Sequence, residues 1–161
     1  MAFRDYEEFI AALNAKRVRY LLIGAHAVAL YARPRATRDL DVFLDPSRAN
    51  SKRVLNALRT FFGGAELGYR EEDLTDPDSV IQLGIAPVRI DLMSAIAGIP
   101  SFRKVWAGRV RAPFGSVPAN YLGLDDLIRA KRATGRDQDR ADLRALERAR
   151  RESSRSRKVP R

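Results

Sequence analysis

The chain has 161 residues, 45% of them hydrophobic, which is typical of one globular domain with a substantial core rather than of a disordered chain. It has no cysteine, which excludes disulfides and thiolate metal sites. It also has no apolar run near the roughly 18 residues of a membrane span, and its opening residues lack the layout of a secretory signal, so we expect a cytoplasmic protein. A net charge of +10 favours anionic partners such as nucleotides, RNA or DNA.

The first half of the chain alternates helical and extended patterns. Gly24 permits a tight turn between the first strand and the second helix, and Pro34 ends that helix. Asp45 and Pro46 suit the start of the third helix. The spacing of the apolar residues predicts a helix at 5–16, a strand at 18–23, a helix at 25–31, a strand at 38–44 and a helix from 45 to about 62.

The second half predicts two more strands, split by Ala86 and Pro87, and ends in helices. In chain order we expect a polar loop at 69–78, strands at 80–85 and 88–93, a short helix at 101–107, an edge strand at 109–112, a helix at 125–134 capped by Asp125 or its neighbour, and a last helix at 137–151. The predicted fold is α+β: a mixed sheet of four or five strands, helices packed on one face, and a C-terminal helical pair that closes a cleft.

Two carboxylates lie side by side on the second predicted strand. Asp39 and Asp41 are two residues apart, and alternate residues of a strand point to the same face, whereas Leu40 and Val42 point toward the core. Two neighbouring carboxylates repel each other, so it is costly to keep both ionised. A divalent metal ion removes that cost, and Mg²⁺ commonly combines one or two carboxylates with the phosphates of a substrate.

A third carboxylate, Asp91, lies on the strand predicted at 88–93 and shares a face with Arg89. If this strand pairs beside that of Asp39, three carboxylates converge. Two metal ions about 3.5–4 Å apart could then clamp the attacking and leaving oxygens of a phosphoryl displacement. Asp91 could also accept the proton of an acceptor hydroxyl. The alternatives are a salt bridge from Asp91 to a nearby arginine and an acidic surface patch.

The glycine between the first strand and the second helix suits phosphate binding. Because it has no Cβ, Gly24 lets the backbone approach a ligand closely, and the helix that follows presents unpaired N–H groups. These groups and the helix dipole attract phosphate. A glycine after a strand also occurs in ordinary turns, so the interpretation depends on the acidic pair 15 residues later.

Taken in order, these motifs resemble the minimal nucleotidyltransferases of the polymerase-beta superfamily. The resemblance is carried by Gly24-Ala25-His26, by Arg35-Ala-Thr-Arg-Asp39-Leu-Asp41, by Arg89-Ile-Asp91-Leu, and by residues 121–143, where a helical lysine precedes a Gly-Arg-x-x-Asp turn. It covers residues 18–147 and is greatest to the bacterial branch that includes the AbiEii-type toxins of toxin–antitoxin systems.

The resemblance implies transfer of a nucleotidyl group from an NTP with loss of pyrophosphate, with Mg²⁺ as the cofactor and Mn²⁺ as the alternative. It implies that the catalytic metal ligands are Asp39, Asp41 and Asp91. It implies that the nucleotide contacts are Gly24, Ala25, Arg38 and Lys131. Position 25 departs from the family pattern, because many members place Ser or Gly there and Ala25 offers only its backbone N–H.

Each of several basic or titratable residues near the motifs has two possible roles. Arg35 and Arg38 flank the acidic strand, and either neutralise triphosphate charge by bidentate contact or lie in solvent. Lys131 lies one turn beyond Leu127 and either reaches the cleft or is a solvated helix lysine. His26, the one histidine, is either an acid–base catalyst or a hydrogen-bonded structural residue.

The sequence does not identify the acceptor of the nucleotidyl group. The resemblance suggests RNA, including tRNA, or a protein as the acceptor, and an antitoxin protein as a further partner. An alternative function is that of a degenerate transferase which binds nucleic acid or protein without catalysis. Ala25 and the basic C-terminal segment favour this alternative, and the three intact aspartates disfavour it. An enzyme that adenylylates a small molecule is a third alternative.

The C-terminal segment carries most of the excess charge. Residues 148–161 hold seven basic residues and one acidic residue, so six of the ten net positive charges lie there. We expect a domain at 1–147 and a flexible basic tail at 148–161, which is either a solvated end or a contact for nucleic acid. Asp139 and Asp142 are expected to pair with Arg136 and nearby arginines rather than with a metal ion.

Overall fold

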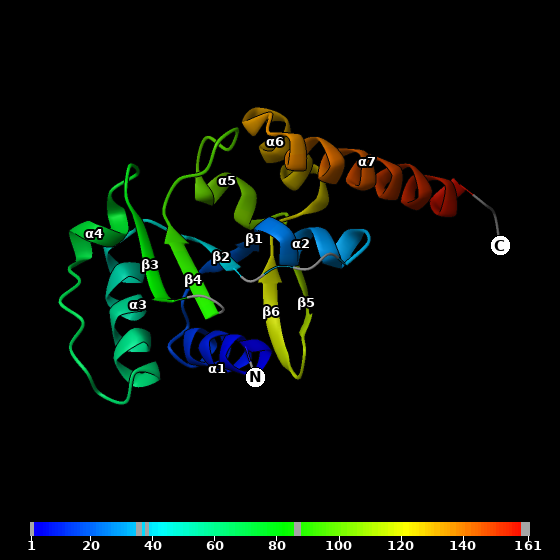
Figure 1. Cartoon of the computed structure of the whole chain (residues 1–161). Coiled ribbons are helices and arrows are strands. Elements are labelled where there is room, and N and C mark those ends of the chain that lie inside the picture. Colours follow the sequence, from blue (N-terminus) through cyan, green and yellow to red (C-terminus); the bar gives the residue numbers. More distant parts are fainter. Residues whose placement is uncertain (1, 35–36, 38, 86–87, 159–161) are drawn as a thin grey trace.

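The computed structural model describes residues 2–34, 37, 39–85 and 88–158, and these residues form one mixed sheet with helices around it (Figure 1). The predicted turn at 86–87 and the predicted nucleotide contact Arg38, together with Arg35, lie outside the described residues. The elements are α1 (Ala2–Ala15), β1 (Tyr20–Ile23), α2 (Gly24–Tyr31), β2 (Asp39–Leu44), α3 (Arg48–Phe61), α4 (Glu71–Thr75), β3 (Val80–Ile85), β4 (Val88–Met93), α5 (Phe102–Trp106), β5 (Val110–Phe114), β6 (Val117–Tyr121), α6 (Leu124–Thr134) and α7 (Asp137–Lys158).

The sheet has six strands in the described part of the chain, in the order β3-β4-β2-β1-β6-β5. The acidic strand β2 is central, antiparallel to β1 and parallel to β4. At the other end of the sheet β6 is parallel to β1, and β5 is antiparallel to β6. The α+β fold class with a mixed sheet and a C-terminal helical pair is confirmed, but the predicted count of four or five strands is wrong.

The extra strand is β6, where Val117, Ala119 and Tyr121 do alternate with other residues, but Pro118 lacks a backbone N–H donor and argues against a strand within a sheet. Partners that are distant in sequence stabilise it. Leu22 of β1 lies beside Tyr121, and the Leu122 N–H donates to the Leu22 carbonyl at 3.1 Å. On its other edge, β6 pairs with β5 in an antiparallel hairpin. Tertiary pairing therefore overrides a weak local signal.

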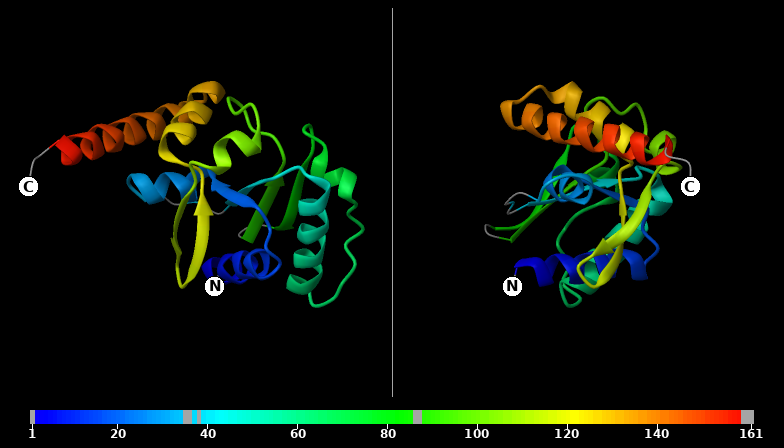
Figure 2. Two further views of the ribbon diagram at one scale, coloured as in Figure 1. Left: turned by 180° about the vertical axis from the view of Figure 1, so that it is seen from behind. Right: turned by 90° about the vertical axis from the view of Figure 1, so that its right-hand side faces the viewer.

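Helices α1 and α3 pack together beside the sheet, at the opposite end of the molecule from the C-terminal pair α6 and α7 (Figures 1 and 2). Phe9 of α1 meets Phe61 of α3 edge to face, with ring centroids 5.2 Å apart. On β2, Leu40 and Val42 are fully buried, as the alternation predicts, which leaves Asp39 and Asp41 on the other face.

Helix boundaries differ from the predictions where a cap or a tertiary contact decides them. The N-cap of α3 is Ser47, whose side chain accepts from the Asn50 N–H at 3.2 Å, rather than Asp45. Helix α6 begins after Gly123, without a side-chain cap from Asp125 or its neighbour. A short helix, α4, lies within the predicted polar loop.

The last helix α7 continues to Lys158, seven residues beyond its predicted end at Arg151, and its final turns are exposed. Arginine is a good helix former and no proline intervenes before position 160, so nothing local stops the helix. None of the helices in the described ranges combines the length and the apolar character that a membrane span requires.

Candidate functional site

The three predicted carboxylates lie on neighbouring strands and on one face of the sheet. Strands β2 and β4 are parallel, with Asp41 directly beside Asp91 and Asp39 directly beside Arg89. Paired residues of adjacent strands share a face and lie about 4.8 Å apart across the backbone. The predicted pairing of the Asp91 strand with the Asp39 strand is therefore present, and it brings the three carboxylates together.

A cavity of about 640 Å³ opens over this acidic face, a size within the usual range of small-molecule sites. The end of β1 and the start of α2 form one wall, β2 and β4 form the floor, and α6 and α7 form the opposite wall. The charged residues that line it are Asp39, Asp41, Arg89, Asp91, Lys131, Arg136 and Asp139. The topology thus brings segments more than a hundred residues apart to one cavity.

The carboxylates repel one another. Burial, followed by the negative charges of Asp91 and Asp39, raises the pKa of Asp41 to about 6. Asp91 is only 7% exposed, and its Oδ1 atom is buried without a hydrogen-bond partner among the described residues. A buried carboxylate oxygen without a partner is costly, so this site is poised to accept a cation or a proton.

Arg89 is the cation that now balances this charge. Its Nη2 atom lies 3.1 Å from Asp91 Oδ2 and 3.3 Å from Asp39 Oδ2. These carboxylates raise the pKa of the Arg89 guanidinium. Tyr6 of α1 fixes the backbone of the same residue, because its hydroxyl donates to the Arg89 carbonyl at 3.2 Å.

In the described ranges, no group of three or more His, Asp or Glu side chains is arranged so that it could hold a metal ion. Arg89 supplies a physical reason, since its guanidinium bridges two of the three carboxylates. The donor chemistry itself suits Mg²⁺, because carboxylate oxygens are its preferred ligands and Asp91 has an unpaired one. The three carboxylates therefore suit Mg²⁺ chemically, and the Arg89 guanidinium would have to move out of contact with them for the ion to bind.

Gly24 brings the backbone of the β1–α2 junction against the acidic strand. It has a left-handed φ of +70°, and a Cβ at this position would collide with the Asp41 carboxylate. Helix α2 begins at Gly24, its N-cap Ile23 makes no side-chain cap bond, and both Gly24 and Ala25 line the cavity. The first N–H groups of the eight-residue helix α2 therefore belong to the cavity wall.

Lys131 lines the cavity but is not a solvated helix lysine. Its Nζ atom lies 3.1 Å from Asp139 Oδ1 and 3.2 Å from Asp142 Oδ2, which ties α6 to α7. Arg136 Nε lies 2.8 Å from Asp139 Oδ2, as expected for that pair. Burial alone would raise the pKa of Asp139, but hydrogen bonds from Thr134, Arg136 and Lys131 outweigh it and hold the pKa well below its usual range.

Two cationic residues of the cavity, Arg89 and Arg136, were not among the sequence-predicted site residues. Strand alternation could have identified Arg89, which shares a face with Asp91. Arg136 belongs to the Gly-Arg-x-x-Asp turn that carries part of the resemblance, but its place in the cavity depends on the packing of the α6–α7 turn. His26 is outside the cavity lining and packs its ring against Tyr6 and Phe114, and burial lowers its pKa, which favours a structural role. The predicted hydrogen bonding is not found at its Nε2 atom, which is buried without a partner among the described residues.

Comparison with known proteins gives one family. A family described as "Nucleotidyltransferase of unknown function (DUF6036)" matches residues 2–151. This range includes the whole sheet and every described residue of the cavity lining. No curated protein matches the chain.

Proposed function

The chain belongs to this nucleotidyltransferase family, and we propose that it transfers a nucleotidyl group from an NTP to an acceptor hydroxyl with the help of a divalent metal ion. The observation that carries the proposal is the placement of Asp39, Asp41 and Asp91 on adjacent strands at the floor of one cavity. Kinship with the polymerase-beta superfamily and its AbiEii-type toxins, and a toxin role, are supported by the sequence motifs alone.

In the proposed reaction the acceptor oxygen forms a bond to the α-phosphorus, and the bond from that phosphorus to the pyrophosphate oxygen breaks. The acceptor proton passes to a carboxylate, for which Asp91 is suited by its unpaired Oδ1 atom. The N–H groups at the start of α2 and the cations of Lys131 and Arg136 suit the triphosphate on the cavity walls. A bound Mg²⁺ or Mn²⁺ would be held by Asp39, Asp41 and Asp91 and would offset phosphate charge.

The test uses Asp41→Asn, which keeps the side-chain shape and removes one charge. Wild-type protein is incubated with each radiolabelled NTP, Mg²⁺ and total cell extract, and the labelled acceptor is isolated. We expect Asp41→Asn to lower label transfer at least about 100-fold, the scale of a lost transition-state contact. The matched control Asp78→Asn changes an exposed aspartate outside the cavity and should keep full transfer. Equal transfer by wild type and Asp41→Asn would contradict the proposal.

A second function, binding without catalysis, is favoured by the contact of Arg89 with two of the carboxylates and by the pairing of Lys131 with Asp139 and Asp142. The two functions differ in their response to nucleotide. A nucleotidyltransferase should be stabilised against heat by Mg²⁺ with an NTP, because a ligand that binds the folded state raises its stability. A pure binder should respond to RNA or protein and not to Mg²⁺ with an NTP.

A further inference from the structure

One face of α7 carries a regular row of basic side chains, which we name the α7 basic stripe. Its members recur at intervals of four, four, three, four and three residues: Arg140, Arg144, Arg148, Arg151, Arg155 and Lys158. At 3.6 residues per turn these positions fall within an arc of about 80°, and the row is about 27 Å long. The stripe is therefore a narrow, straight line of positive charge.

The stripe faces solvent. All six of its side chains are exposed, whereas the buried residues of α7 are on the other side of the helix. Within the described ranges, Arg140 has an acidic neighbour, Asp137 at 3.7 Å, and no ion pair is found for the other five. Arg150, which lies off the stripe, pairs with Asp125 at 3.0 Å. Two further acids of α7, Glu147 and Glu152, lie three or four residues from members of the stripe, and Glu147 is paired with Arg132 of α6. Six cations against these acids leave an excess of positive charge on this face, which an anion would offset.

The stripe starts at the cavity and leads away from it. Gln138 and Asp139 line the cavity, and Arg140 is the next residue. From there α7 runs past α2 and projects from the body of the protein (Figures 1 and 2). Helices α2 and α7 are in contact, and Arg33 follows shortly after the end of α2. A polyanion that follows the stripe would therefore bring one end to the cavity.

A second hollow lies along the flank of the stripe. It measures about 460 Å³ and lies between the end of α6 and the C-terminal half of α7. Its charged lining residues are four arginines and one glutamate: Arg132, Glu147, Arg150, Arg151 and Arg155. Glu147 is paired with Arg132 at 2.7 Å, so the positive charge of the hollow is in excess. Planar guanidinium groups suit phosphate oxygens because they can bond them in pairs.

We propose that the α7 basic stripe docks the phosphate backbone of an RNA and directs the 3′ end of that RNA into the acidic cavity. The stripe has no aromatic or amide side chain, so it suits backbone contact rather than base reading. RNA is chosen over DNA because the proposed transfer needs an acceptor hydroxyl, and an unmodified terminal ribose offers both a 2′- and a 3′-hydroxyl, whereas a terminal deoxyribose offers only the 3′-hydroxyl. The choice of RNA and its role as the acceptor rest on the proposed function, whereas the docking of a nucleic-acid backbone on the stripe does not.

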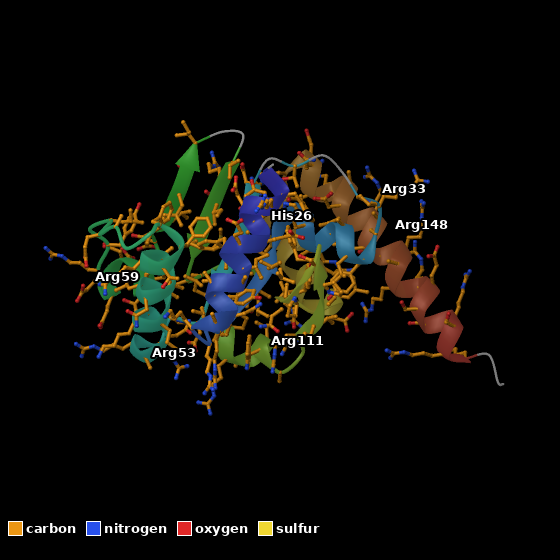
Figure 3. The ribbon with its side chains drawn as sticks, turned by 90° about the horizontal axis from the view of Figure 1, so that it is seen from below. His26, Arg33, Arg53, Arg59, Arg111 and Arg148 are labelled. Atoms are coloured by element: carbon orange, nitrogen blue, oxygen red, sulfur yellow. The ribbon has the colours of Figure 1, made fainter. Side chains whose placement is uncertain are left out.

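The binding experiment is done in EDTA without NTP, so that it does not depend on catalysis. The probe is a fluorescent RNA hairpin of about 24 nucleotides with a single-stranded 3′ end, and anisotropy is measured from 50 to 200 mM salt. The test variant carries Arg144→Gln, Arg148→Gln and Arg151→Gln. The control variant carries Arg53→Gln, Arg59→Gln and Arg111→Gln, which are exposed residues away from α7 with the same total charge change (Figure 3).

We expect the test variant to bind at least tenfold more weakly than wild type, and its slope of log affinity against log salt to be shallower by about two to three. The control should change affinity less than threefold with the same slope. Thermal unfolding should be unchanged in both variants, because every substituted side chain is exposed. Arg148→Glu, a single exposed substitution, should weaken binding at least fivefold.

Four results would overturn the proposal: no binding by wild type, equal weakening by both triple variants, stronger binding to DNA of the same sequence, or stronger binding to vesicles of anionic lipid. The direction of docking is tested with 4-thiouridine at the 3′ end of the RNA, which should crosslink to cavity residues. Crosslinks confined to the last turns of α7 would contradict that placement. RNA binding without label transfer would refute the proposed function and leave the docking surface standing.

Discussion

Asp41 lies between Asp39 on its own strand and Asp91 on the next, so its ionisation is opposed by two negative charges and by burial. Arg89 offsets part of this repulsion by bridging Asp39 and Asp91. At the residue scale, the repulsion among these carboxylates therefore reduces the stability of the folded protein, and the same negative charges allow the site to bind a cation. Functional sites commonly hold such perturbed groups.

Asp41→Asn should make the metal-free protein more stable at neutral pH. The folded state raises the pKa of Asp41 from 3.8 to about 6, so the folded protein binds this proton more tightly than the unfolded chain. The contribution of Asp41 to stability is therefore most favourable below pH 3.8, where the group is protonated in both states, and is lost as the pH rises through about 6. Urea unfolding in EDTA should show a gain of roughly 2–3 kcal/mol for the variant at pH 7.5 and well under about 1 kcal/mol at pH 4. A gain that is the same at both pH values would contradict this.

Gly24→Ala should destabilise the protein and weaken nucleotide binding, because the added methyl group would collide with the Asp41 carboxylate. The matched control is Gly63→Ala: Gly63 has φ +66°, close to the +70° of Gly24, but has nothing within 4 Å of the added Cβ. Both variants incur the left-handed penalty of about 1–2 kcal/mol, and Gly24→Ala should lose at least about 1 kcal/mol more. Equal losses in thermal unfolding would show that Asp41 can move aside.

At the scale of elements, the C-terminal helical pair is held over the cavity by ion pairs as well as by apolar contacts. Lys131 of α6 is 11% exposed and contacts two acids of α7, Asp139 and Asp142. Leu146 of α7 is fully buried in the core. The wall of the cavity therefore depends on a buried cation that needs its partners.

Asp139→Asn should loosen this wall and cost about 2–3 kcal/mol at pH 7, because it removes one of the two carboxylates that pair with a buried lysine. The folded state lowers the pKa of Asp139, so its contribution is present above pH 3.8 and is lost as the pH falls below that value. Denaturant unfolding at pH 7 and pH 3 should show the difference shrink at low pH. Asp137→Asn, at a fully exposed carboxylate on the same helix, should show no measurable change at either pH.

At the scale of the whole molecule, the folded body and the projecting end of α7 have separate roles. The described sheet, its helices and Leu146 form one core, whereas residues 148–158 are exposed except for Ala149, which is partly exposed. Six of the ten net positive charges lie in residues 148–161. Stability should therefore come from the body, and most of the excess charge from the C-terminal segment.

A chain that stops after Glu147 should fold with a melting temperature within about 2 °C of wild type, because the ion pair between Arg150 and Asp125 that it loses is exposed. A chain that stops after Arg144 also loses Leu146, whose removal from the core costs about 2–5 kcal/mol. Calorimetry on the two truncated proteins separates these cases. A large loss in the longer chain would mean that residues 148–161 are part of the domain.

The amino-acid sequence was enough to predict the strand of the acidic motif, because residues 39–42 alternate carboxylates with buried apolar residues, and alternation is a local property of a strand. It also determined that residues 88–93 form a strand with Asp91 and Arg89 on one face. The family match over residues 2–151 agrees with the nucleotidyltransferase resemblance at that level.

Only the tertiary structure decided that β2 and β4 are parallel and adjacent, with Asp41 beside Asp91, because strand order depends on non-local pairing. It also decided that Arg89 reaches across to Asp39 on the neighbouring strand and that Lys131 is paired with α7, because each of these contacts joins different elements of the fold. The reason is physical: alternation fixes which way a side chain points, and packing fixes what it meets.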